Sequence, residues 1–191
     1  MRGARRFSQA VSEGDGISLL ADASGGDAAR AAESVGAEGI VARPGASGLR
    51  DATDLPILWY GAGEIGAEDL DACVVPVEGF EDEDERLERL FAAALEAGMD
   101  CVVAVRDEDE LQLALERLDP EIVLLRAVPA DHGLAHVLSL LPDVPAGKLA
   151  VAELEEVTRS DVVELERAGV DAVIVPAGAV EQLVGEPAPG P

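Results

Sequence analysis

The sequence predicts a compact (β/α)8 TIM barrel with shortened loops and some reduced helices. Eight short apolar stretches rich in Val, Ile and Leu alternate with polar or helical segments, a pattern typical of parallel strands joined by helices. Only 3% of the 191 residues are aromatic, so the core must consist of small aliphatic side chains, which suits layered packing inside a closed parallel sheet. An open doubly wound sheet is the alternative, but it would leave two of the stretches unexplained.

The strand assignments rest on apolar runs that several times open in the same way. Glu38, Asp71, Asp100 and Asp171 each precede one or two small residues and then valine or isoleucine. The spacing between these copies leaves room for one helix or a tight turn. The strands are expected near residues 17–22, 39–43, 56–60, 72–77, 101–105, 121–126, 148–153 and 171–175.

Three connecting segments carry clear helix signals. Each repeats apolar residues at helical spacing, and the acids at the start of the first complement the helix dipole. The third follows Thr158 and ends at Gly169, a good C-cap. The three helices are expected at 84–97, 107–118 and 160–168. The connectors 44–54 and 61–70 are short and rich in Gly, Ala and Asp, so helices there should be one or two turns long or missing.

Length and composition limit the domain organisation and the partners. We expect one domain over residues 1–184 and a disordered tail, rich in Pro and Gly, over 185–191. A barrel usually takes about 250 residues, so this one must have shed most of its loops. The chain carries 39 acids against 14 Lys and Arg, a net charge of −25, which repels nucleic acid and anionic membranes. We interpret the acidic shell as an adaptation for solubility or high salt.

Targeting and redox signals are also absent from the sequence. No apolar run approaches the ~18 residues of a membrane span, and the amphipathic segment that starts at Phe7 is not a secretory signal core. Cys73 and Cys101 each begin a strand and are interpreted as small buried apolar residues. Two cysteines do not make a disulfide framework, so we expect a reducing, cytoplasmic setting. We also expect a monomer.

Parts of the chain resemble a known enzyme family. Val-Thr-Arg-Ser-Asp-Val at 157–162 and Ala-Gly-Val-Asp-Ala-Val-Ile-Val at 168–175 closely resemble the seventh and eighth units of indole-3-glycerol-phosphate synthase, a barrel of tryptophan biosynthesis. Residues 7–22 resemble that family's N-terminal helix and first strand, and residues 106–111 resemble the acidic start of its fifth helix. The resemblance implies a TIM barrel of lyase ancestry that needs no cofactor.

The resemblance spans the chain, strongly over 98–175 and weakly over 44–97, but most of the family's reactive groups are missing. The family closes an indole ring with a lysine and an acid on the first strand, a lysine on the third, a glutamate on the fifth and an asparagine on the sixth. The corresponding positions here hold Ser24, Asp22, Tyr60, Ala104 and Arg126. Only Glu153, at the end of the seventh strand, keeps the family's residue type.

The lysine count supports the loss of this reaction without an alignment. Lys148 is the only lysine, and it begins the seventh strand, at the end of the barrel away from the chemistry. The phosphate site is also reduced, because Glu155 and Glu156 replace small residues after the seventh strand. After the eighth strand, only Ala177 and Gly178 offer backbone N–H groups to a phosphate.

Asp22, Tyr60, Arg126 and Glu153 are the candidate residues for any remaining site, because all lie at strand ends that converge on one mouth. Arg106 lies just beyond another strand end. One interpretation is an ion-paired plug in which Arg126 neutralises Asp22 and Glu153. The other is a pocket for a small polar ligand, in which Arg126 grips a carboxylate and Trp59 or Tyr60 stacks on it.

His132 and His136, with Asp131 beside them, have the spacing of zinc ligands on one helix face. No third ligand is clearly placed, so we expect no metal. Three functions remain: a non-catalytic or ligand-binding homologue of the synthase, residual synthase activity, or a repurposed enzyme acting on a small carboxylate at the mouth.

Overall fold

The computed structural model describes residues 7–14, 16–61, 70–79, 85–127 and 132–184. Eight parallel strands pair in chain order and close into a barrel, because β1 pairs with β8 as well as with β2. The strands are β1 (Ser18–Asp22), β2 (Gly39–Ala42), β3 (Ile57–Trp59), β4 (Ala72–Pro76), β5 (Asp100–Val105), β6 (Ile122–Arg126), β7 (Leu149–Glu153) and β8 (Ala172–Pro176). The predicted barrel is therefore confirmed, and every strand lies within about two residues of its expected place.

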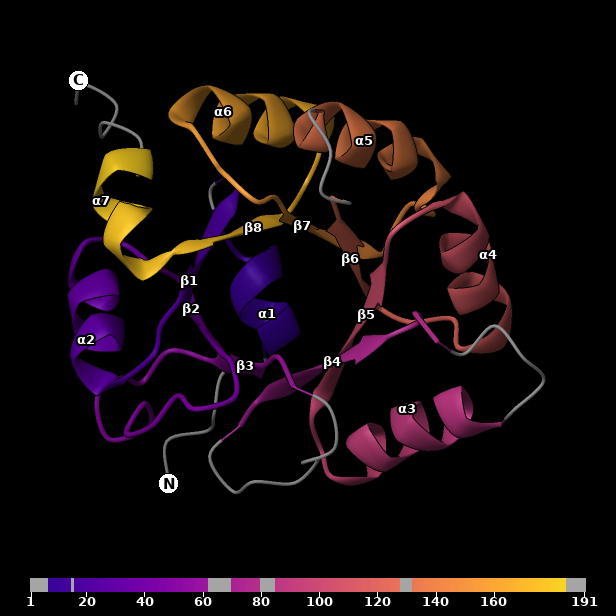
Figure 1. Cartoon of the computed structure of the whole chain (residues 1–191), viewed down its shortest axis with the longest axis horizontal. Helices are drawn as coiled ribbons and strands as arrows, with labels where there is room; N and C mark the ends of the chain where they lie inside the picture. Colours follow the sequence, from indigo (N-terminus) through magenta and orange to yellow (C-terminus); the bar gives the residue numbers. More distant parts are fainter. Residues whose placement is uncertain (1–6, 15, 62–69, 80–84, 128–131, 185–191) are drawn as a thin grey trace.

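Helices surround the barrel as an outer layer (Figure 1). They are α2 (Gly26–Ser34), α3 (Arg86–Glu96), α4 (Glu108–Arg117), α5 (Gly133–Leu140), α6 (Arg159–Ala168) and α7 (Val180–Leu183), with short 3-10 turns η1 (Leu141–Asp143) and η2 (Ala177–Ala179). The connection from β2 to β3 contains no helix, as its composition predicts. Most of the connector at 61–70 and the whole tail at 185–191 lie outside the described residues.

The three helices with clear signals begin and end close to their predicted limits. Asp107 caps α4 by accepting a hydrogen bond from the backbone N–H of Glu110 at 2.9 Å. Thr158 and Asp161 form a reciprocal capping box at the start of α6. Gly169 ends α6 with a φ of +96°, a left-handed conformation that favours glycine.

The barrel interior is filled by aliphatic side chains and closed at the amino ends of the strands. Side chains such as Leu20, Leu58 and Leu124 form the inner cluster, and the short helix α1 (Phe7–Ser12) packs against it with Phe7 fully buried. The backbone N–H of Ser8 donates to the carboxylate of Asp100 at 2.8 Å. This plug at the bottom leaves the carboxyl ends of the strands as the exposed mouth.

The repeated acid at the strand starts has a structural role. Asp171 donates its backbone N–H to the carbonyl of Ala150 at 2.9 Å and accepts the N–H of Ala150 on its side chain at 2.7 Å. Asp71 repeats this arrangement with Ile57, at 3.0 and 2.8 Å. Each acid therefore binds both main-chain groups of one residue on the preceding strand and fixes the register there.

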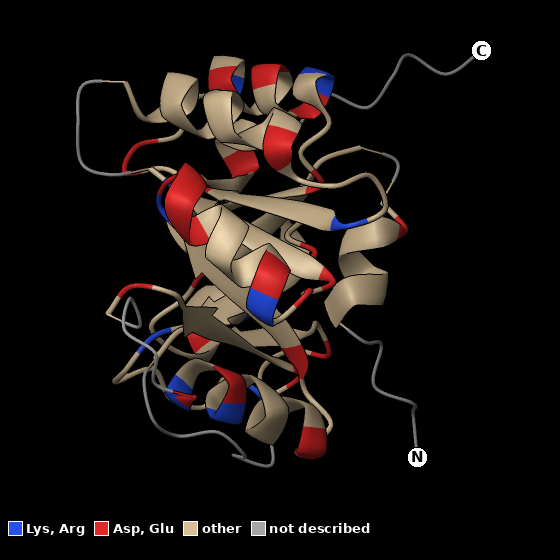
Figure 2. Cartoon of the chain, turned by 90° about the vertical axis from the view of Figure 1, so that its right-hand side faces the viewer, with Lys and Arg blue, Asp and Glu red and all other residues tan. Residues whose placement is uncertain are grey.

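The surface is acidic over the outer helices (Figure 2). Within the described ranges, no helix combines the length and the apolar character needed to cross a membrane.

Candidate functional site

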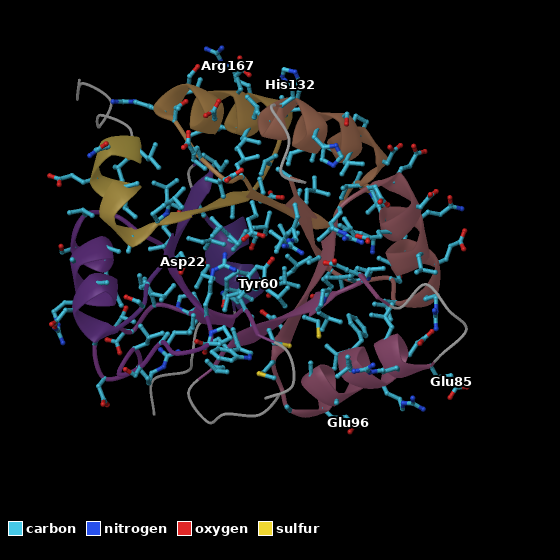
Figure 3. All side chains as sticks on the ribbon, viewed as in Figure 1. Asp22, Tyr60, Glu85, Glu96, His132 and Arg167 are labelled. Carbon is cyan, nitrogen blue, oxygen red and sulfur yellow. The ribbon has the colours of Figure 1, made fainter. Side chains whose placement is uncertain are left out.

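The alternation of side chains along the strands brings the four predicted mouth residues together. Asp22, Arg126 and Glu153 are the last residues of β1, β6 and β7, and Tyr60 follows β3. Each lies two positions after an inward-facing residue of the barrel core, so each points into the mouth. Figure 3, which has the same view as Figure 1, shows Asp22 and Tyr60 in the central part of the barrel.

Arg43 is a mouth residue that the sequence analysis missed. Its Nε donates to Asp22 Oδ2 at 2.5 Å, and its Nη2 donates to Glu153 Oε1 at 2.6 Å. The guanidinium also lies over the ring of Tyr60, 4.2 Å from the centroid. Arg43 follows β2 with the same inward parity as Val41, a signal that could have identified it.

Of the two predicted partners of Arg126, Glu153 is confirmed and Asp22 is wrong. Arg126 does bind Glu153, with Nε 3.1 Å from Oε2. The hydrogen-bonded partner of Asp22 is Arg43. The reason is that β6 pairs with β7, which places Arg126 directly beside Glu153, whereas Asp22 ends β1 and neighbours β2.

Glu153 is the centre of the network. Besides the bonds from the two arginines, it accepts a hydrogen bond from the hydroxyl of Tyr60, with the two oxygens 2.7 Å apart. Three donors on one half-buried carboxylate satisfy most of its acceptor capacity. This carboxylate therefore has little hydrogen-bonding capacity left for a ligand.

The network continues to the rim of the mouth. Glu78 lies 2.8 Å from Arg106 Nη1 and 3.7 Å from Arg126 Nη1. Arg106 in turn binds Glu110 through its Nε at 2.9 Å and through its backbone N–H at 2.7 Å. Three guanidinium groups thus meet four carboxylates, and each of these seven charged groups has a partner of opposite sign.

Two groups of the mouth, Tyr60 and Arg43, have raised pKa values. Burial raises the pKa of Tyr60 well above its ordinary value, and the neighbouring Glu153 carboxylate raises it further. Burial opposes the charge on Arg43, but the hydrogen bonds to Asp22 and Glu153 outweigh it and raise the pKa of this group. Tyr60 therefore stays protonated at neutral pH and cannot serve as a general base.

Trp59 does not lie in the mouth. It packs against the outer core between strands and helices, whereas Tyr60 packs against the inner cluster. Its indole Nε1 is buried without a hydrogen-bond partner, and the ring lines an outer cavity of about 330 Å³ beside the loop after β2. The predicted stacking on Trp59 is therefore wrong for the mouth.

The predicted phosphate donors lie in the turn after β8. Ala177 and Gly178 belong to the 3-10 turn η2, and Gly178 is exposed with open space around its Cα. Glu155 and Glu156 are exposed after β7, as their sequence position implies. Phosphate binding by this turn stays a prediction.

The single lysine lies away from the mouth network, and one of the two histidines contacts the main chain of a rim residue. His132 is the N-cap residue of α5, and His136 Nε2 lies 2.6 Å from the carbonyl oxygen of Arg106. Among the described residues, no three His, Cys, Asp or Glu are grouped to hold a metal ion, and Asp131 lies outside them. Lys148 lies at the amino end of β7, as predicted, where its Nζ is 2.5 Å from Asp119 Oδ1.

Comparison with known proteins supports the fold alone. No protein-family profile matches the sequence. Among solved structures, the chain is similar to a thiamine phosphate pyrophosphorylase from Pyrococcus furiosus, with a TM-score of 0.64 and 18% sequence identity. The similarity covers 87% of this chain and 93% of the other. At this identity the two proteins share the TIM-barrel architecture, and the likeness carries no function.

Proposed function

We propose that this chain is a non-catalytic homologue of indole-3-glycerol-phosphate synthase, a barrel whose mouth is closed by an internal ion network and which acts by binding. The observation that carries the proposal is the position of Arg43 between Asp22 and Glu153. It neutralises the two acids that the resemblance aligns with the family's site. Carboxylates paired in this way are not free to contact a substrate.

The missing amines support the same conclusion. The family's chemistry uses two lysines at the mouth, and the single lysine here, Lys148, is bound to Asp119 at the opposite end. The loss of one charged group typically lowers a rate by about a hundredfold or more. The tyrosine in the third-strand lysine position holds its proton and carries no positive charge at neutral pH.

The first experiment is a direct assay of the ancestral reaction. The purified chain is incubated with carboxyphenylamino-deoxyribulose phosphate, and formation of indole-glycerol phosphate is followed by fluorescence. We expect no turnover above the uncatalysed reaction. Turnover at about 1 s⁻¹ or faster, an ordinary enzymatic rate, would overturn the proposal.

Glu153→Gln is the control for weak activity. Glu153 is the one position that keeps the family's residue type, so a residual synthase would lose its activity in this variant. A trace signal that is equal in the wild type and Glu153→Gln comes from a contaminating enzyme. A signal that this substitution abolishes supports the residual-synthase alternative.

A small carboxylate ligand is the second candidate, and Glu78 favours it. Its side chain is 53% exposed and bridges Arg106 and Arg126, the position that a ligand carboxylate would take. Glu78→Gln would remove the acid that the two guanidinium groups share. We expect succinate, malate or inorganic phosphate to raise the melting temperature of Glu78→Gln more than that of the wild type. Equal shifts, or none, would remove this candidate.

A further inference from the structure

Cys73 and Cys101 lie side by side on neighbouring strands. Each is the second residue of its strand, in β4 and β5, and the parallel register pairs them directly. Both side chains belong to the cluster between the strands and the outer helices, so they share one face of the sheet. Both thiols are free, with residues that are 2% and 5% exposed.

This placement matches what a disulfide requires. Neighbouring strands are about 4.8 Å apart, and the Cα atoms of bonded cysteines are about 4.4–6.8 Å apart. We propose that Cys73 and Cys101 form a redox-responsive site, in which a peroxide oxidises the two thiols to an intrachain disulfide that thiol reductants reverse.

A cavity gives an oxidant access to Cys101, and through it to Cys73, its direct neighbour on the next strand. Cys101 lines a cavity of about 420 Å³ outside the amino ends of β5 and β6. The walls combine apolar side chains, among them Phe91, Leu95 and Ile122, with three acids, Asp100, Asp119 and Glu121. Leu95 is 53% exposed at its edge. A small neutral oxidant such as hydrogen peroxide suits this lining better than a bulky anionic disulfide such as oxidised glutathione.

The two thiols have different roles in the reaction. The neighbouring Cys101 thiol lowers the pKa of Cys73, whereas the neighbouring Cys73 thiol, together with burial, raises the pKa of Cys101. The Cys73 thiolate attacks one oxygen of hydrogen peroxide, the O–O bond breaks, and a sulfenic acid and one water form once a proton is taken up. The Cys101 sulfur then displaces the hydroxyl of the sulfenic acid, losing its own proton, and a second water leaves.

The surroundings favour a neutral product. Two thiols and one peroxide give one disulfide and two waters, so no charge remains among the apolar side chains. The reaction also removes the thiol proton of Cys101, whose sulfur lies 3.7 Å from the carbonyl oxygen of Phe91 in α3. Oxidation should therefore loosen the contact between β5 and α3, which faster amide exchange in α3 would register.

The test uses the full-length wild-type chain and hydrogen peroxide. After treatment the protein is unfolded, free thiols are alkylated, and the intact mass is measured. We expect both thiols to disappear together, with a mass loss of about 2 Da, and dithiothreitol to restore both. Peptide mapping separates this product from oxidation of Met99, which adds about 16 Da.

Cys73→Ala and Cys101→Ala are the matched controls, and neither should show the 2 Da loss. Several results would overturn the proposal: thiols that remain alkylatable, independent oxidation of each to sulfinic acid, or disulfides between chains. The same treatment in denaturant is the last control. A disulfide that forms only in the unfolded chain means that the folded site excludes the oxidant.

Discussion

Arg43→Met tests whether the mouth network stabilises the barrel. Exposed ion pairs contribute about 0.2–1 kcal/mol, whereas removing one partner of a buried pair costs about 3–5 kcal/mol. The side chains of Arg43, Asp22 and Glu153 are 38, 31 and 17% exposed, which lies between these cases. Arg43 makes two short charged bonds, so we expect a loss of about 1.5–2.5 kcal/mol, or about 3–10 °C in melting temperature for a chain of this size.

The assay is urea and thermal unfolding at two salt concentrations, with Arg30→Met as the control. Arg30 pairs with Asp27 on the surface of α2 at 3.0 Å, and its removal changes the net charge equally. We expect this control to cost less than about 0.5 kcal/mol. A double-mutant cycle of Arg43→Met with Glu153→Gln then gives the interaction energy between these two side chains.

The sign of the change in melting temperature of Arg43→Met decides whether the mouth network stabilises the barrel. Groups held together for binding or catalysis often cost stability, and replacing them then stabilises the protein. An Arg43→Met variant that melts at or above the wild-type temperature would mean that the mouth is an open functional site. The proposal of a closed, non-catalytic mouth would then fail.

Three further predictions follow from single contacts. Tyr60 is the only tyrosine, and its raised pKa means that phenolate absorbance should be absent from the folded protein near pH 10, where the unfolded chain ionises. The contribution of the protonated Tyr60 to the free energy of unfolding is complete below about pH 10 and falls as the pH rises. Tyr60→Phe should remove both the absorbance change and this pH dependence. In urea unfolding, Asp171→Ala should lower the free energy of unfolding by about 1.5–3 kcal/mol, because the N–H of Ala150 loses a charged acceptor. Asp171→Asn should lower it by less. Equal losses in the two variants would contradict the role of Asp171 as an acceptor. The bond from Arg117 lowers the pKa of Glu88, so the contribution of this pair to stability is present above the unfolded value of about 4.3 and is lost as the pH falls through the lower, folded value. Wild type and Glu88→Gln should therefore converge in stability as the pH falls through that folded value, and a difference that does not change with pH would argue against this pair.

The barrel could be predicted because its signals are local. A short run of β-branched residues, a capping threonine and a terminal glycine each act within a few residues, as at β8 and α6. The packing of α1 across the barrel was harder to predict from the sequence, because the burial of Phe7 depends on the closed barrel above it. An amphipathic segment alone does not indicate which surface it covers.

The mouth was only partly predictable, because its contacts join residues far apart in sequence. Their positions at strand ends identified Asp22, Tyr60, Arg126 and Glu153, and the structure brings them together. Pattern alone did not tell which arginine reaches which acid. Arg43 contacts Glu153 across 110 positions of sequence, and its long side chain spans the opening from β2 to β7.

The acids at the strand starts allow residues at the mouth of the barrel to change in evolution without loss of the fold. Because Asp71 and Asp171 hold neighbouring strands through main-chain groups, the alignment of those strands does not depend on the residues at the opposite rim. Substitutions there can remove one chemistry, or introduce another, while the architecture persists. The same property makes this short chain a suitable host for a designed site, built by exchanging rim residues and leaving the acidic anchors untouched.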